Sequence, residues 1–159
     1  MIMDELLEFA DAVSVAAAAG TALIGDVIDL GAVPQDHGNG QPMYLVILTS
    51  TEIITGGVAG TLKFQLVTDA AAAIATNGTA TVHIDTGTFV TDGTDANDAQ
   101  LKAGGVIWMG ALPVGEARVY ERYMGILAIT ATTTTTAGAI NAFLTRDPSS
   151  WKSYADAAN

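Results

Sequence analysis

Short segments rich in β-branched residues, separated by turn-forming residues, constrain the fold of this chain more than any other feature. Thr is frequent throughout and forms an unbroken run over residues 132–136. β-Branched side chains suit a pleated strand better than a helix interior. The 17 Gly residues recur at short intervals together with Asn and Asp, as expected for tight connections between strands. The sequence therefore predicts many strands.

Two segments show the strand signal most clearly. Residues 43–49 are nearly all apolar, which predicts a strand buried on both faces or at the centre of a sandwich. Within residues 61–68, Leu62, Phe64 and Leu66 alternate with Lys, Gln and Val, a period of two that is typical of a strand with one wet face. We expect these two segments to be partners.

Weaker signals give the remaining elements. Asn77-Gly78 is a favoured two-residue hairpin turn and predicts that residues 71–76 pair with 79–85, although 71–74 fit a short helical turn equally well. Residues 12–18 are ambiguous between helix and strand. Further strands are expected at 27–30, 105–109, 116–130 and 135–145.

About eight strands with short connections predict an all-β fold, either a β-sandwich or a barrel. A jelly roll fits the strand count, so we expect an antiparallel, jelly-roll-like β-sandwich. We expect one domain over residues 1–159. Residues 1–11 are a possible N-terminal arm or helical turn, and 149–159 are a C-terminal tail. The polar stretch 93–104 is interpreted as an insertion loop within the domain.

Charge and composition exclude several classes of function. The chain has no Cys, so disulfides, thiolate metal sites and Cys nucleophiles are impossible. Its net charge of −11 is spread along the chain, and nucleic acid is not an expected partner because its binding relies on Lys and Arg.

The acidic N-terminus lacks the positively charged start of a secretory signal. The most apolar window, 12–24, is shorter than the ~20 residues of a membrane span, so a soluble protein without membrane contact is predicted.

Candidate metal ligands are few. Asp92, Asp95 and Asp98 lie in one loop, and calcium prefers such oxygen ligands, but their spacing is not that of an EF-hand and a solvated turn is favoured. His37 and His83 are interpreted as an exposed loop residue and a solvent-facing strand residue, with no third ligand at a suitable spacing. No metal or cofactor is expected.

Catalytic motifs are also missing. None of the Ser residues lies in a Gly-x-Ser-x-Gly elbow, and the Gly-rich segments lack the setting of a phosphate-binding loop. Glu116 and Glu121 could pair with other acids as in a β-sandwich glycosidase, but aromatic residues make up only 6% of the chain. We expect no enzyme, and a carbohydrate-binding or hydrolytic β-sandwich remains the alternative of a different class.

A family resemblance rests on the C-terminal half. An Arg122-Tyr123 strand, the Thr-rich turn, the Ala-Gly-Ala segment at 137–145 and Asp147-Pro148 resemble the carboxy-terminal part of capsid cement (decoration) proteins of tailed bacteriophages. Asp11-Ala12 and segments 27–31 and 38–46 are similar to earlier parts of that family. The acidic 93–104 region and the aromatic tail after Pro148 depart from the pattern.

The resemblance implies a jelly-roll-like sandwich without enzymatic activity. It implies a homotrimer on the outer surface of the capsid, made in the host cytoplasm, that binds several copies of the major capsid protein. Another virion component, such as a tail or minor head protein, is the alternative within the same class.

Apolar residues near the chain ends are candidates for contacts with a neighbouring subunit or the shell, because apolar and aromatic anchors concentrate at interface cores. The alternative is that they close the sandwich of their own subunit. The candidates are Leu6, Leu7, Phe9, Trp151 and Tyr154.

Overall fold

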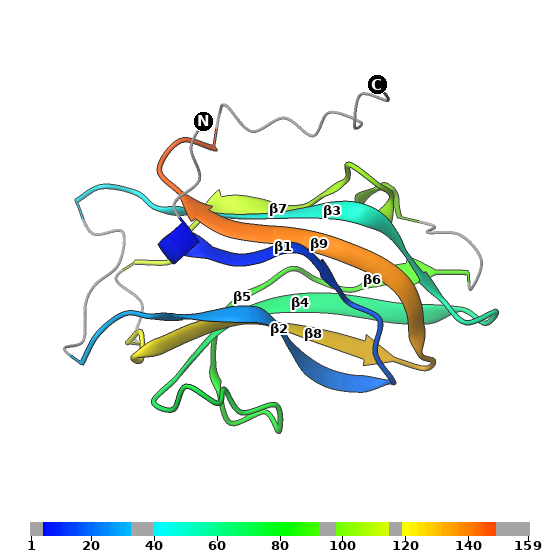
Figure 1. Ribbon diagram of the computed structural model, residues 1–159, viewed down its shortest axis with the longest axis horizontal. Coiled ribbons are helices and arrows are strands. Elements are labelled where there is room, and N and C mark those ends of the chain that lie inside the picture. Colours follow the sequence, from blue (N-terminus) through cyan, green and yellow to red (C-terminus); the bar gives the residue numbers. More distant parts are fainter. Residues whose placement is uncertain (1–4, 33–39, 93–97, 115–118, 149–159) are drawn as a thin grey trace.

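Two antiparallel sheets pack face to face in the computed structural model, which describes residues 5–32, 40–92, 98–114 and 119–148 (Figure 1). The all-β sandwich is confirmed. In chain order the elements are η1 (Glu5–Leu7), β1 (Glu8–Ser14), β2 (Gly20–Asp29), β3 (Tyr44–Thr55), β4 (Gly60–Asp69), β5 (Thr81–Asp85), β6 (Phe89–Thr91), η2 (Ala99–Leu101), β7 (Val106–Ala111), β8 (Tyr123–Ala131) and β9 (Thr135–Thr145).

The strand order is that of a jelly roll. Sheet A runs β1-β9-β3-β7, and sheet B runs β2-β8-β4-β5 with β6 also paired to β4. β5 pairs with the second half of β4 and β6 with its first half, so together they fill one strand position. The chain changes sheet at every connection except those between β4, β5 and β6, which gives the eight-position jelly-roll arrangement.

The expected partnership of 43–49 with 61–68 is wrong. Both segments are strands, but β3 lies between β9 and β7 in sheet A, whereas β4 lies between β8 and the β5 and β6 pair in sheet B. The short 56–59 connection therefore crosses between the layers instead of closing a hairpin. Local alternation marks a strand, but it does not decide whether the next strand is a neighbour in the same sheet or lies opposite.

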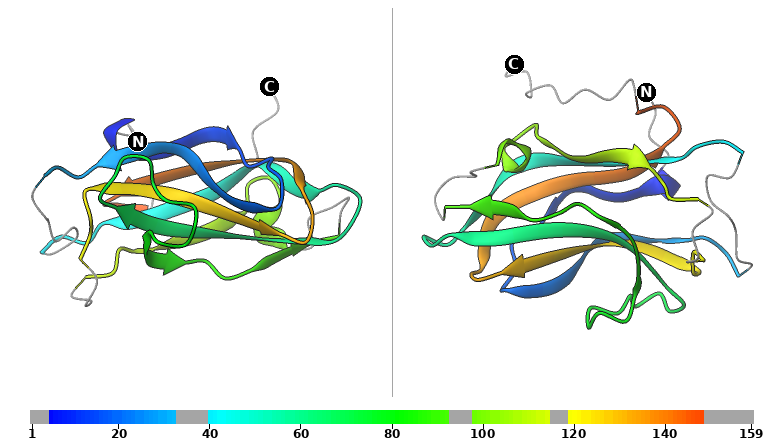
Figure 2. Two further views of the ribbon diagram at one scale, coloured as in Figure 1. Left: turned by 90° about the horizontal axis from the view of Figure 1, so that it is seen from below. Right: turned by 180° about the vertical axis from the view of Figure 1, so that it is seen from behind.

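The expected hairpin at Asn77-Gly78 is also wrong, because residues 71–76 form no strand. β4 itself pairs with β5, and the 70–80 connection lies against the outer face of sheet B (Figure 2). The Asp69 carboxylate accepts hydrogen bonds from the backbone N–H groups of Ala71 and Ala75, both at 3.0 Å. These bonds close a compact loop where a strand arm was expected.

The 70–80 connection has its own small apolar cluster. Ile74 is 5% exposed and packs with Val67 and Leu127 on the outer side of sheet B. A Cβ on Gly125 of β8 would lie 2.6 Å from Ile74 Cδ1. The absence of a side chain at this position makes room for Ile74.

The other expected elements agree with the structure or differ at their ends. Residues 135–145 match β9, the ambiguous 12–18 segment overlaps strand β1, and β8 starts at Tyr123 instead of residue 116. η1 provides the helical turn predicted near the N-terminus. The main core lies between the sheets and includes Phe9, Leu45, Ile47, Ile53, Leu62, Phe64, Leu66, Leu101, Met124, Ile126 and Ile140.

Candidate interaction surfaces

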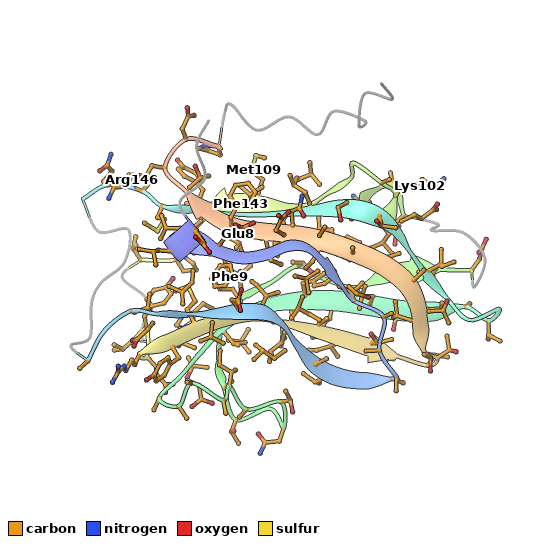
Figure 3. All side chains as sticks on the ribbon, in the orientation of Figure 1. Glu8, Phe9, Lys102, Met109, Phe143 and Arg146 are labelled. Carbon is orange, nitrogen blue, oxygen red and sulfur yellow. The ribbon has the colours of Figure 1, made fainter. Side chains whose placement is uncertain are left out.

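One row of side chains crosses the outer face of sheet A. Glu8 of β1 pairs with Phe143 of β9, Phe143 pairs with Val46 of β3, and Val46 pairs with Met109 of β7. Directly paired residues of an antiparallel sheet lie on the same face. These four residues, called here the outer row, therefore face away from sheet B, as Figure 3 shows for Glu8, Phe143 and Met109.

The middle of the outer row is deeply buried although it does not face the core. Val46 is 0% exposed and Phe143 is 3% exposed, whereas Met109 at the end of the row is 39% exposed. Their chain neighbours Leu45 and Leu144 point the other way, into the core between the sheets. β3 is thus buried on both faces, as its apolar sequence predicts.

Glu8 places a carboxylate beside this apolar row. Its Oε1 atom is buried and has no hydrogen-bond partner among the described residues. Burial raises the pKa of Glu8, and the nearby acids Asp11, Glu5 and Asp26 raise it further. A carboxylate in this position favours a partner that brings a proton or a positive charge.

The same acids line an open depression of about 460 Å³ between the edges of β1 and β2. Like charges gathered at one edge discourage contact with an equally acidic surface. Within the described residues, no group of three or more His, Asp or Glu side chains is arranged to hold a metal ion. The depression is therefore an acidic feature of the surface.

The outer face of sheet B is partly covered and partly polar. The 70–80 connection covers the half near Val67, while on the other half Lys63 Nζ donates to Asp85 at 2.9 Å and Gln65 Nε2 donates to the same carboxylate at 2.6 Å. Burial alone would raise the pKa of Asp85, but the hydrogen bonds from Lys63 and Gln65 outweigh it and lower the pKa. This half of the face is a satisfied polar surface.

The two ends of the sandwich expose apolar side chains. η1, the start of β3, the end of β7 and the end of β9 lie together, and we call this the η1 end (Figure 1). It exposes Leu6 (79%), Val114 (50%) and Val119 (64%). At the opposite end and along β6, Val58 and Val90 are 60% and 43% exposed.

The η1 end is braced by an ion pair. Arg122 Nε and Nη2 donate to both carboxylate oxygens of Asp29 at 2.9 and 2.7 Å, and the Leu30 N–H donates to the Arg122 carbonyl at 2.7 Å. The guanidinium also lies 4.9 Å from the centre of the Tyr123 ring. These contacts fasten the end of β2 to the start of β8.

The five predicted contact residues have different environments. Leu6 is largely exposed, Leu7 is partly buried against the core, and Phe9 is 0% exposed within the core. Phe9 therefore packs within the sandwich of its own subunit, which was the alternative to a contact role. A fully buried ring cannot contact a neighbouring subunit. Trp151 and Tyr154 lie outside the described residues.

Asp92, Asp95 and Asp98 were the weak candidates for calcium ligands. Among the described residues, Asp92 and Asp98 do not belong to any group of three or more side chains that could hold a metal ion. The Asp98 carboxylate accepts a hydrogen bond from the Val90 N–H at 2.6 Å, which ties the loop back to β6. Asp92 directly follows β6, and Asp95 lies outside the described residues. Asp98 thus has a local structural role in closing this loop.

His83 is half-buried, which corrects the solvent-facing position expected for it. Its ring stacks on Tyr120 with centroids 4.1 Å apart, and its Nε2 lies 2.8 Å from the Thr68 hydroxyl oxygen. The Glu121 carboxylate accepts a hydrogen bond from the Thr81 hydroxyl at 2.6 Å. His37 and Glu116 lie outside the described residues.

Neither short helix of the described chain has the length and apolar character needed to cross a bilayer.

Comparison with known proteins gives one family. The family model Bbp16 matches residues 9–144, a span that begins at the second residue of β1 and ends at the penultimate residue of β9. The match therefore includes every strand of the sandwich. No curated protein matches the chain.

Proposed function

The chain belongs to the Bbp16 family, a phage-associated family, and from this premise we propose that it is a capsid cement subunit. In this role it binds the outside of the phage head and stabilises contacts between major capsid subunits. The observation that carries the proposal is the family match over the whole sandwich, together with the C-terminal resemblance to cement proteins. Its partners are the major capsid protein and further copies of itself in a homotrimer.

The surface is suited to protein contacts. Three large aliphatic side chains, Leu6, Val114 and Val119, are exposed at the η1 end. Apolar residues in the centre of an interface supply most of its stability, and exposed apolar groups commonly mark such sites. We therefore assign the η1 end as the surface that faces the shell.

The charge of the chain agrees with a position outside the head. A net charge of −11 repels nucleic acid, so the subunit is unsuited to a place beside the packaged genome. On the outside, an added subunit that bridges capsid proteins contributes extra contacts to a shell under internal pressure. No catalytic step is required for this function.

A binding experiment with heads that lack this protein tests the proposal. Purified wild-type subunit is added to the heads, and bound copies are counted after sedimentation. We expect Val119→Asp to weaken binding about tenfold or more, since a charge forced into an apolar interface costs at least ~1.4 kcal/mol. Val58→Asp, at the opposite end and similarly exposed, is the matched control and should bind normally.

Three results would contradict the proposal or the surface assigned to it. Wild-type subunit that fails to bind the heads would exclude a cement role. Labelled subunit found by electron microscopy at the tail or at a single vertex would assign it to another virion component. Equal loss of binding in the Val58 and Val119 variants would reject the η1 end as the contact surface.

A further inference from the structure

The free edge of β7 is a second feature of the subunit that suits contact with another protein. β7 is the last strand of sheet A, and among the described strands it pairs only with β3 (Figure 1). The two strands keep one register from Trp108 to Ala111. The Leu112 N–H donates to the Met43 carbonyl oxygen at 2.8 Å. This bond fixes which residues of β7 direct their backbone groups toward β3.

Two residues of β7 direct their backbone groups away from the sheet. In an antiparallel pair, residues that bond to the partner strand alternate with residues whose N–H and C=O groups point outward. Leu112 bonds to β3, so Gly110 and Trp108 do so as well. The N–H and C=O groups of Met109 and Ala111 therefore point outward. Both residues are exposed, Met109 to 39%, so an added strand can reach these donors and acceptors.

β7 lacks the features that keep an edge strand from pairing with another chain. Edge strands are commonly protected by charged residues, proline, irregular register or short length. β1, β2 and β5 each contain an acidic residue and a shift of register, and β6 has only three residues. β7 contains no charged residue and no proline, and its shift of register precedes Trp108. Its second half is therefore open to an extended partner.

The position of this edge favours the major capsid protein as the occupant. β7 ends at Ala111, three residues before Val114, whose exposed side chain belongs to the η1 end that we assign to the shell. A second copy of the chain does not suit the edge. Two β7 edges would pair about a two-fold axis, which does not generate a trimer, and the other edge strands are protected.

We propose that an extended segment of the major capsid protein adds to sheet A as a strand beside β7. Its backbone pairs with the outward N–H and C=O groups of Met109 and Ala111, and an apolar side chain of the segment contacts the exposed side chain of Met109. Main-chain hydrogen bonds supply the affinity in this mode of recognition. The inference rests on the proposed cement function, and it adds a main-chain contact to the apolar contact at the η1 end.

Hydrogen exchange of backbone amides tests this pairing directly. The full-length subunit is labelled alone and after binding to heads that lack it, and exchange is measured residue by residue. In the free subunit the Met109 and Ala111 amides should exchange quickly, while the Gly110 amide is protected by its bond to β3. On heads, exchange of Met109 and Ala111 should slow by about tenfold or more, with Gly110 unchanged.

A variant of the edge links the pairing to affinity. Ala111→Pro removes an outward N–H without removing a bond to β3, and proline is tolerated on edge strands where the nitrogen faces solvent. We expect this variant to bind heads about tenfold more weakly, because a hydrogen bond is lost and the ring obstructs the added strand. Ala111→Val keeps the N–H at similar bulk and is the matched control, which should bind normally. Circular dichroism verifies that both variants are folded.

The outcomes separate this proposal from the cement function. Wild-type subunit that does not bind heads would refute the cement function, and the pairing with it. If the wild type binds heads and Val119→Asp weakens binding, but the Met109 and Ala111 amides still exchange quickly on heads, the pairing is overturned and the cement function stands. Normal binding by Ala111→Pro would also overturn the pairing. Protection of both amides in the free subunit that is lost on dilution would overturn it as well, because the occupant would be a second copy.

Discussion

Gly25 lies where the edge of β2 approaches β1. Its φ is +67°, and a Cβ at this position would collide with the carbonyl oxygen of Phe9, which is backbone and cannot move aside. Gly25→Ala should therefore destabilise the protein by about 3 kcal/mol or more, from the positive φ and the overlap together. Urea unfolding measures the change.

A matched glycine separates the two effects. Gly57 has a similar φ of +70°, but a Cβ there would meet nothing within 4 Å. Gly57→Ala should cost only about 1 kcal/mol, the strain of the backbone conformation. Equal losses in the two variants would show that the approach of β1 to Gly25 does not constrain the fold.

The Asp29–Arg122 ion pair predicts a pH dependence. The hydrogen bonds from Arg122 lower the pKa of Asp29 to about 2, against an ordinary value of ~3.9. Because the folded-state pKa is the lower one, the pair adds stability above about pH 4, and this contribution disappears as the pH falls through about 2. An NMR titration of the Asp29 carboxyl should give the low midpoint, and Arg122→Gln should return it toward the ordinary value.

Single residues also show the limit of the sequence prediction for the site. The sequence predicts one contact role for the apolar residues of segment 4–9, which are Leu6, Leu7 and Phe9. In the structure η1 ends at Leu7 and β1 begins at Glu8, so the periodicity changes within the segment and Phe9 turns into the core while Leu6 stays exposed. A pattern of six residues is too short to reveal such a change of conformation.

At the scale of elements, the 70–80 connection makes a clear prediction. Ile74 is 5% exposed and packs onto the outer face of sheet B. Ile74→Ala should destabilise the protein by about 2 kcal/mol, the low end for such truncations because the cluster is small. Thermal unfolding measures the loss, and Thr76→Ala, at an exposed position of the same connection, should have little effect.

Hydrogen exchange provides a second measure of this element. Truncation of Ile74 should accelerate exchange of the backbone amides in the 70–80 connection, because local opening becomes easier. The amides of β3 and β9 in sheet A should keep their protection. A uniform loss of protection in both sheets would contradict a local role for this connection.

The location of strands was largely predictable, but their partners were not. Alternation in 61–68 and the apolar run in 43–49 are local signals, and both segments are strands. Which sheet each strand joins depends on contacts between residues far apart in the chain, such as Val46 with Phe143. The outer row is formed by such long-range contacts. The only part of it that the sequence predicted is the burial of β3 on both faces, from its apolar residues.

At the scale of the whole molecule, the proposed homotrimer predicts a mass in solution. Sedimentation should give three times the subunit mass of 16.2 kDa. Because each subunit carries a net charge of −11, association should weaken at low ionic strength and strengthen as salt screens the repulsion. A monomeric mass at all protein and salt concentrations would contradict the trimer.

The gathering of η1 and the end of β9 at one end has a practical consequence for engineering. The first and last described residues, Glu5 and Pro148, both belong to this end, whereas the turn between β3 and β4 lies at the other (Figure 1). If the η1 end meets the shell, a foreign peptide inserted beside Glu5 or Pro148 would be pressed against the lattice. A foreign peptide inserted at Gly57 would instead project into the medium, which makes this turn the natural position for display on assembled particles.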